Sequence, residues 1–71
     1  MNAEFDYDAA TDSLYIKLRP GESVDNRIVG DDIVVDIGID CEPVGYDIQH
    51  ASQHPEAIAE ALGYLHQRHA A

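Results

Sequence analysis

The chain has 71 residues, a length that suits one small domain whose core supplies only about 3–5 kcal/mol of stability. Association with another protein is therefore expected. Fourteen Asp and Glu against four Lys and Arg give a formal charge of −10, which repels nucleic-acid phosphates and anionic lipid heads. Direct binding to nucleic acid or to a membrane is therefore disfavoured. The charge leaves two alternatives, a basic protein partner or solubility alone.

The sequence also indicates a compartment. The first eight residues, MNAEFDYD, have neither a basic start nor an apolar run, and no segment is long and apolar enough to cross a bilayer. The single cysteine, Cys41, has no partner for an internal disulfide, which suits a reducing environment. We therefore expect a cytoplasmic protein.

Two alternating segments open the chain. Residues 4–8 and 13–18 each place apolar side chains on one face and polar side chains on the other, the two-residue period of a half-buried strand. The short turn between them predicts a hairpin in which apolar residues meet on one face and an ion pair forms on the other. The predicted pairs are Tyr7 with Leu14, Phe5 with Ile16, and Glu4 with Lys17.

A third, weaker strand follows a Pro-Gly break and covers residues 23–29. The Gly-Asp pair at residues 30–31 resembles a two-residue turn of type II′, because Gly occupies its first central position. This register sets Asn26 opposite Val35, so we expect Asn26 near the sheet edge or bonded to a neighbour. The other predicted pairs are Ile28 with Ile33 and Val24 with Ile37.

The last two strands, IVVDI and VGYDI, are predicted to bury alternate residues against each other. A tight turn at Asp40 and Cys41 would join them, although Cys tolerates the positive φ of such a turn less well than Gly. Either the loop is longer, over residues 38–43, or the turn is strained. The predicted core pairs are Ile37 with Val44, Val35 with Tyr46, and Ile33 with Ile48. On the outer face, Val34 is expected opposite Asp47 and Asp36 opposite Gly45.

From residue 54 to residue 68 the apolar period changes to that of an amphipathic helix, with Pro55 in the first turn. The predicted stripe is Ile58, Ala61, Leu62 and Leu65. These patterns predict a small α+β fold: an antiparallel β-meander of about five strands over residues 4–49, with one C-terminal helix packed on one face. Residues 1–71 would form a single domain whose uncovered edge strands invite pairing with another chain.

Two segments resemble motifs of a known family. Residues 7–16, YDAATDSLYI, match the pattern Y-D-x-x-x-D-x-L-Y-I throughout. Residues 38–48 match D-x-D-G-x-x-V-G-x-E-I in part, with Cys41 in place of Gly and Asp47 in place of Glu. The chain thus resembles, over about residues 4–52, the prokaryotic domain-of-unknown-function family numbered 2283. The resemblance implies a small β-rich domain without an established activity, and relatives beside small toxin-like proteins imply an antitoxin-like role.

The reactive side chains do not form a recognisable catalytic set. Asp8 and Asp12 flank a turn, where short carboxylates cap backbone N–H groups, and the turn offers too few ligands for a cation. Cys41 lies between two acids, which oppose a thiolate. The histidines form two pairs at opposite ends of a helix about 20 Å long, so one zinc site within the chain is not expected. No catalytic residue, metal ligand or cofactor is predicted.

Five residues remain as candidates for a ligand site or an interface: Tyr15, Val34, Asp36, Asp47 and Gly63. The first four are expected on the outer sheet face, and Gly63 on the polar side of the helix, as a close-approach point or a tolerated surface glycine. The first hypothesis is a non-enzymatic protein that self-associates or binds a basic partner. The alternative is a metal- or small-ligand-binding domain, or a minimal enzyme, whose site forms between subunits from Asp36, Asp47 or the histidines.

Overall fold

The computed structural model describes residues 4–69, with side chains described as far as residue 66. Over this range the chain forms five antiparallel strands followed by one α-helix, which confirms the predicted small α+β fold. No helix within the described range has the length and hydropathy of a membrane span. The elements are β1 (Glu4–Asp8), β2 (Ser13–Lys17), β3 (Asp25–Val29), β4 (Ile33–Ile37), β5 (Pro43–Ile48), the short 3₁₀ helix η1 (Ala51–Gln53) and α1 (Pro55–His69).

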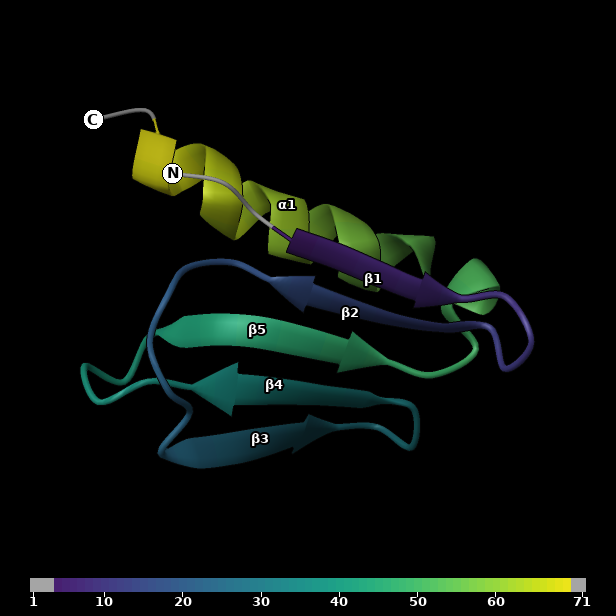
Figure 1. Cartoon of the computed structure of the whole chain (residues 1–71), viewed down its shortest axis with the longest axis horizontal. Coiled ribbons are helices and arrows are strands. Elements are labelled where there is room, and N and C mark those ends of the chain that lie inside the picture. Colours follow the sequence, from purple (N-terminus) through teal and green to yellow (C-terminus); the bar gives the residue numbers. More distant parts are fainter. Residues whose placement is uncertain (1–3, 70–71) are drawn as a thin grey trace.

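The strands do not cross the sheet in sequence order. Their spatial order is β1-β2-β5-β4-β3, so the last strand is the central one (Figure 1). Hairpins join β3 to β4 and β4 to β5, and a longer connection between β2 and β3 allows β2 to pair with β5. This arrangement of four strands is a Greek key. As a result β1 and β3 are the two edges of the sheet, and α1 runs lengthwise along it (Figure 1).

The first hairpin has the predicted register. Tyr7 lies opposite Leu14 and Phe5 opposite Ile16, as the alternation of the two strands requires. Glu4 also lies opposite Lys17, but the Lys17 ammonium donates to the Gly21 carbonyl oxygen at 2.9 Å. The predicted Glu4–Lys17 ion pair is therefore wrong, because the β2–β3 connection offers the ammonium a closer acceptor.

The second hairpin differs from the prediction by one residue. Val29 lies opposite Ile33, so the turn contains three residues, 30–32, with Gly30 at a φ of 72°. A one-residue slip moves every side chain of a strand to the other face of the sheet. The observed pairs are Asp25 with Ile37, Asn26 with Asp36, Arg27 with Val35, and Ile28 with Val34. The predicted pairs of Ile28 with Ile33, Val24 with Ile37 and Asn26 with Val35 are wrong.

The third hairpin keeps most of its predicted register. Ile33 lies opposite Ile48 and Val35 opposite Tyr46, but an irregularity places Ile37 opposite Pro43, so the predicted Ile37–Val44 pair is wrong. The loop between β4 and β5 has both features that the sequence offered as alternatives. It is longer than a tight turn, spanning residues 38–42, and Cys41 has a positive φ of 68°. The Arg19 guanidinium stabilises it by donating to Asp40 Oδ1 and to the carbonyl oxygens of Glu42 and Pro43.

The core lies between the three central strands and the helix. Ala57 and Ala61 are its buried helical residues, and small side chains there allow the helix to approach the sheet closely. Leu62, predicted in the stripe, is 41% exposed, because the helix turns Tyr64 toward the core instead. The buried cluster consists of Ile16, Leu18, Val35, Ile37, Tyr46, Ile48, Ala51, Ala57 and Ala61.

One helix covers only the middle of a five-stranded sheet. Every residue of β1 and every residue of β3 is exposed. Phe5 and Tyr7 point to the helix face, yet they remain 55% and 54% exposed. On the outer face, Ile28 is 77% exposed. The edges of the sheet therefore present both apolar side chains and backbone groups to solvent.

Candidate functional site

The outer face of the sheet brings together the polar residues that the alternation of the strands predicts there. Because β5 is inserted between β2 and β4, Tyr15 lies opposite Asp47, which in turn lies opposite Val34. Asp36, the next residue of β4 after Val34 on the same face, lies opposite Gly45 on one side and Asn26 on the other. Tyr15, Asn26, Val34, Asp36 and Asp47 are called the outer-face cluster below.

A hydrogen bond across the central strand organises this cluster. Tyr15 Oη donates to Asp36 Oδ2 at 2.9 Å, and the phenol ring passes over Gly45 to reach it. A Cβ atom at position 45 would lie 2.2 Å from Tyr15 Oη, so the arrangement requires glycine there. Asn26 Nδ2 donates to the other oxygen of Asp36, Oδ1, at 3.3 Å. Both Asp36 oxygens therefore accept a hydrogen bond.

The electrostatics of the cluster keep Tyr15 protonated. Burial, the hydrogen bond to Asp36, and the negative charges of Asp36 and Asp47 raise the pKa of Tyr15 to about 12. The phenol is thus a fixed donor at neutral pH. Asp47 Oδ1 accepts a bond from Gln49 Nε2 at 3.2 Å. These contacts satisfy the carboxylates internally and leave the cluster without a nucleophile and a base in mutual contact.

Of the five predicted candidates, the structure brings four together. Tyr15, Val34, Asp36 and Asp47 share the outer face, whereas Gly63 lies on the exposed side of α1, with open space where a Cβ would stand. Sequence reasoning missed Asn26, which it placed on the inner face. If residues 30–32 had been predicted as a three-residue hairpin loop, Asn26 would have been placed beside Asp36.

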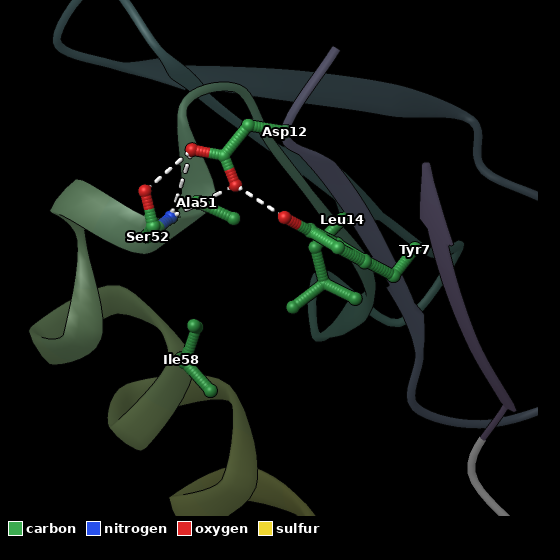
Figure 2. Close-up of a pocket in the computed structure, with 6 residues that line it drawn as sticks. All are labelled: Tyr7, Asp12, Leu14, Ala51, Ser52 and Ile58. Atoms are coloured by element: carbon green, nitrogen blue, oxygen red, sulfur yellow. Dashed lines mark hydrogen bonds between the residues drawn. The ribbon is translucent and has the colours of Figure 1, made fainter. Parts of the chain in front are cut away.

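A second polar group ties the first hairpin to the start of the helix. Asp12 Oδ1 accepts a bond from Tyr7 Oη at 2.7 Å, and Asp12 Oδ2 accepts one from Ser52 Oγ at 2.6 Å (Figure 2). Ser52 N lies 3.2 Å from both carboxylate oxygens, and Ala51 N donates to the Asp12 carbonyl oxygen. We call Tyr7, Asp12 and Ser52 the Asp12 anchor.

The anchor acts at the N-terminus of η1, where backbone N–H groups lack partners within the helix. The Ser52 hydroxyl, followed by the Tyr7 phenol, lowers the pKa of Asp12, so the carboxylate is ionised at neutral pH. Asp12 has a φ of 55°, a conformation that Asp adopts more readily than most residues. Asp8 caps the N–H of Ala10 at 3.0 Å, which confirms the turn-capping interpretation for Asp8. Asp12 instead caps a segment distant in sequence.

Two hollows flank the helix. The first, about 260 Å³, lies below the Asp12 anchor and is lined mainly by Leu14, Ala51 and Ile58 (Figure 2). The second, about 200 Å³, lies between α1 and the β3–β4 side of the sheet. Both are smaller than the ~300–1,000 Å³ of typical small-molecule sites. They mark the places where one helix fails to cover the sheet.

Asp32 brings together the two histidines that precede the helix. Its Oδ2 lies 2.8 Å from His54 Nε2, and its Oδ1 lies 3.2 Å from His50 Nδ1. Contact with Asp32, followed by contact with Glu56, raises the pKa of His54, and His54 lowers the pKa of Asp32. Within the described residues no group has the arrangement of a metal site. The predicted pairing of His66 with His69 lies outside the described side chains.

Comparison with known proteins places the chain in a family. No curated protein and no solved structure matches it. A family model with the description "Protein of unknown function (DUF2283)" matches residues 4–52, the region that contains the whole sheet and the Asp12 anchor. The motif residues Tyr7 and Asp12 are two of the three members of that anchor. The chain therefore belongs to this family of proteins of unknown function.

Proposed function

We propose that the chain is a non-enzymatic, cytoplasmic interaction protein that joins another protein through an exposed edge of its sheet. The observation that carries this proposal is β3, which ends the sheet and is exposed at all of its positions. An edge strand presents a row of unpaired N–H and C=O groups, the template on which proteins add a strand from a partner.

The surface charge indicates which foreign partners would bind. The formal charge of −10 attracts basic proteins and repels nucleic acid and anionic membranes. A small basic toxin-like protein belongs to this class, which keeps the antitoxin-like role within the proposal. Self-association is the other form of the same function, because it uses the same strand edge.

The alternative of a shared metal or small-ligand site has no specific support. Asp36 already accepts bonds from Tyr15 and Asn26, and Asp47 accepts one from Gln49. A divalent cation needs several convergent ligands, and among the described residues no group of three or more His, Cys, Asp or Glu side chains could hold one. The outer-face cluster is therefore assigned to sheet architecture and surface contact.

The proposal is tested by light scattering and by co-purification from the source organism. Asp25→Lys on β3 and Asp6→Lys on β1 make the same change of charge at the two exposed edges. Association should be lost with Asp25→Lys and retained with Asp6→Lys. A wild-type chain that is strictly monomeric and retrieves no partner would refute the proposal.

A further inference from the structure

We propose that the partner is a second copy of this chain, bound by antiparallel pairing of β3 with β3 of the copy about a two-fold axis at Asn26. This inference rests on the proposed function and names its partner. An isologous interface must be complementary to itself, and the order of residue types along this edge meets that requirement.

The segment from Val24 to Ile28 is self-complementary. It contains, in order, an apolar residue, an acid, an amide, a base and an apolar residue. Antiparallel pairing centred on Asn26 sets Asp25 opposite Arg27 of the partner subunit, and Arg27 opposite the partner's Asp25. The same register sets Val24 opposite the partner's Ile28. Every cross-strand pair in this register is favourable or neutral.

The charged pairs lie on the helix face of the sheet. Side chains alternate along a strand, so Asp25 and Arg27 share the helix face, and Ile28 lies on the outer face. Val24 directly precedes β3, and its N–H donates to the Ile37 carbonyl oxygen. Val24 is 62% exposed and Ile28 is 77% exposed in the single chain. Pairing that continues past Asp25 would bring Val24 beside the partner's Ile28, twice per dimer, and would reduce the exposed apolar surface of this edge.

Arg27 has no carboxylate partner within the described part of its own chain. Lys17 donates to the Gly21 carbonyl oxygen, and Arg19 is held by the loop around Asp40. No ion pair involves Arg27 among the described residues, although its side chain stands on the edge strand and is exposed. In a strongly acidic chain, a free cation two residues from an acid is available to the acid of a second copy.

Neighbouring registers are less favourable. Centring the pair on Arg27 sets two guanidinium groups opposite each other, and centring it on Asp25 sets two carboxylates opposite each other. Like charges directly opposite are destabilising. Only the axis at Asn26 satisfies both charges and both apolar residues at once.

The other edge does not suit self-pairing. β1 carries Glu4, Asp6 and Asp8 on its outer face and no base, so two copies of β1 would bring acids together. Pairing of β1 with β3 would leave an edge free at each end and build open chains. The two-fold pairing of β3 is closed: it leaves an acidic β1 at both ends of the combined sheet and stops at a dimer.

Charge reversal tests this register directly. Asp25→Arg and Arg27→Asp each place like charges opposite each other at two points of the dimer, so each variant alone should dimerise at least about tenfold more weakly. An equimolar mixture of the two variants should recover a heterodimer, because its charges are again complementary. The double variant Asp25→Arg with Arg27→Asp should dimerise like the wild type. Molar mass is measured by light scattering across a range of protein concentrations.

Asp6→Arg on β1 is the matched control and should leave dimerisation unchanged. The altered residues are exposed, and recovery in the mixture shows that each variant is folded. A mixture that does not recover would overturn the register at Asn26, and dimers that persist in both single variants would overturn the pairing of β3 with β3. A monomeric wild type that still binds another protein would overturn self-pairing while leaving the proposed function intact. A monomeric wild type without any partner would overturn both.

Discussion

β1 and β3 both lie at an edge of the sheet, and every residue of both strands is exposed, yet they are held in place differently. β1 is fastened to the helical segment through Tyr7, whose hydroxyl reaches Asp12 and, through it, Ser52. Among the described residues, no side-chain hydrogen bond joins β3 itself to η1 or α1. On the β3 side of the sheet, Asp32 in the β3–β4 loop makes this contact, with His54 just before α1.

The charges of the two strands differ as well. β1 carries three acids and no base, which protects it from pairing with its own copy. β3 carries one acid and one base around a central amide. Exposure alone therefore does not identify an interaction edge; the order of charges and the ties to the rest of the fold distinguish a protected edge from one suited to pairing.

The largest effect on stability is expected where the two halves of the sheet are joined. Gly45→Ala would place a Cβ against Tyr15, force the ring aside and break its bond to Asp36, at a cost of about 1–3 kcal/mol. Gly63→Ala is the control, because open space surrounds that position in the helix and Ala should stabilise by about 0.5–1 kcal/mol. Denaturant unfolding measures both. Equal stability of the two variants would contradict the role given to Gly45.

The next effect concerns the fastening of β1. In dilute solution, where the chain is monomeric, Asp12→Ala removes the acceptor for Tyr7 and Ser52 and should lower the melting temperature by several degrees, whereas Asp25→Ala on β3 should leave it nearly unchanged. Asp12→Asn keeps the tolerance for positive φ and one acceptor oxygen, so an intermediate value is expected. A larger loss for Asp25→Ala than for Asp12→Ala would reverse the proposed difference between the edges.

The contact between Asp32 and His54, which links the β3–β4 loop to the start of α1, should depend on pH. Folding raises the pKa of His54 above 6.5, so the contribution of its contact with Asp32 is fully present below pH 6.5 and is lost as the pH rises through the raised value. Folding lowers the pKa of Asp32, so its contribution is present above pH 3.8 and is lost as the pH falls through the lowered value. The difference in melting temperature between wild type and His54→Gln, measured across this range, should shrink at both ends. A constant difference would show that the contact does not titrate.

The smallest effect on stability is expected on β3. Ile28→Ser should change the free energy of unfolding of the monomer by no more than about 0.5 kcal/mol, because the side chain is exposed. The same substitution should weaken dimerisation, since Ile28 would lie opposite Val24 of the partner subunit. Unfolding measured in dilute solution and light scattering in concentrated solution separate the two effects. A large loss of monomer stability would show that β3 is packed more tightly than its exposure indicates.

The sequence predicted the strand pairing correctly where a short loop allowed only one register. The turn between β1 and β2 allowed only the pairing of Tyr7 with Leu14 that the structure shows. The β3–β4 turn allowed two- and three-residue forms with the same alternation, and the wrong choice moved Asn26 to the inner face. The poor fit of a polar Asn26 opposite Val35 was the visible sign of that error.

In the candidate site too, local alternation predicted some features, and others depended on the order of the strands. The alternation of β2, β4 and β5 was enough to place Tyr15, Asp36 and Asp47 on one face. The bond from Tyr15 to Asp36 could not be predicted, because it requires β5 to lie between β2 and β4. The contact of Asp12 with Ser52 joins residues far apart in sequence, where no local pattern links them.

The amino-acid sequence by itself determined which segments are strands and which is a helix, and which side chains share a face, because a period of two or of 3.6 is local information. It also determined the acidic surface and the self-complementary order of residues 24–28. Only the tertiary structure decided that β5 is central, that β1 and β3 are edges, and that α1 leaves both edges uncovered. Those features follow from long-range packing and loop geometry, in which one residue in a turn exchanges the two faces of a strand.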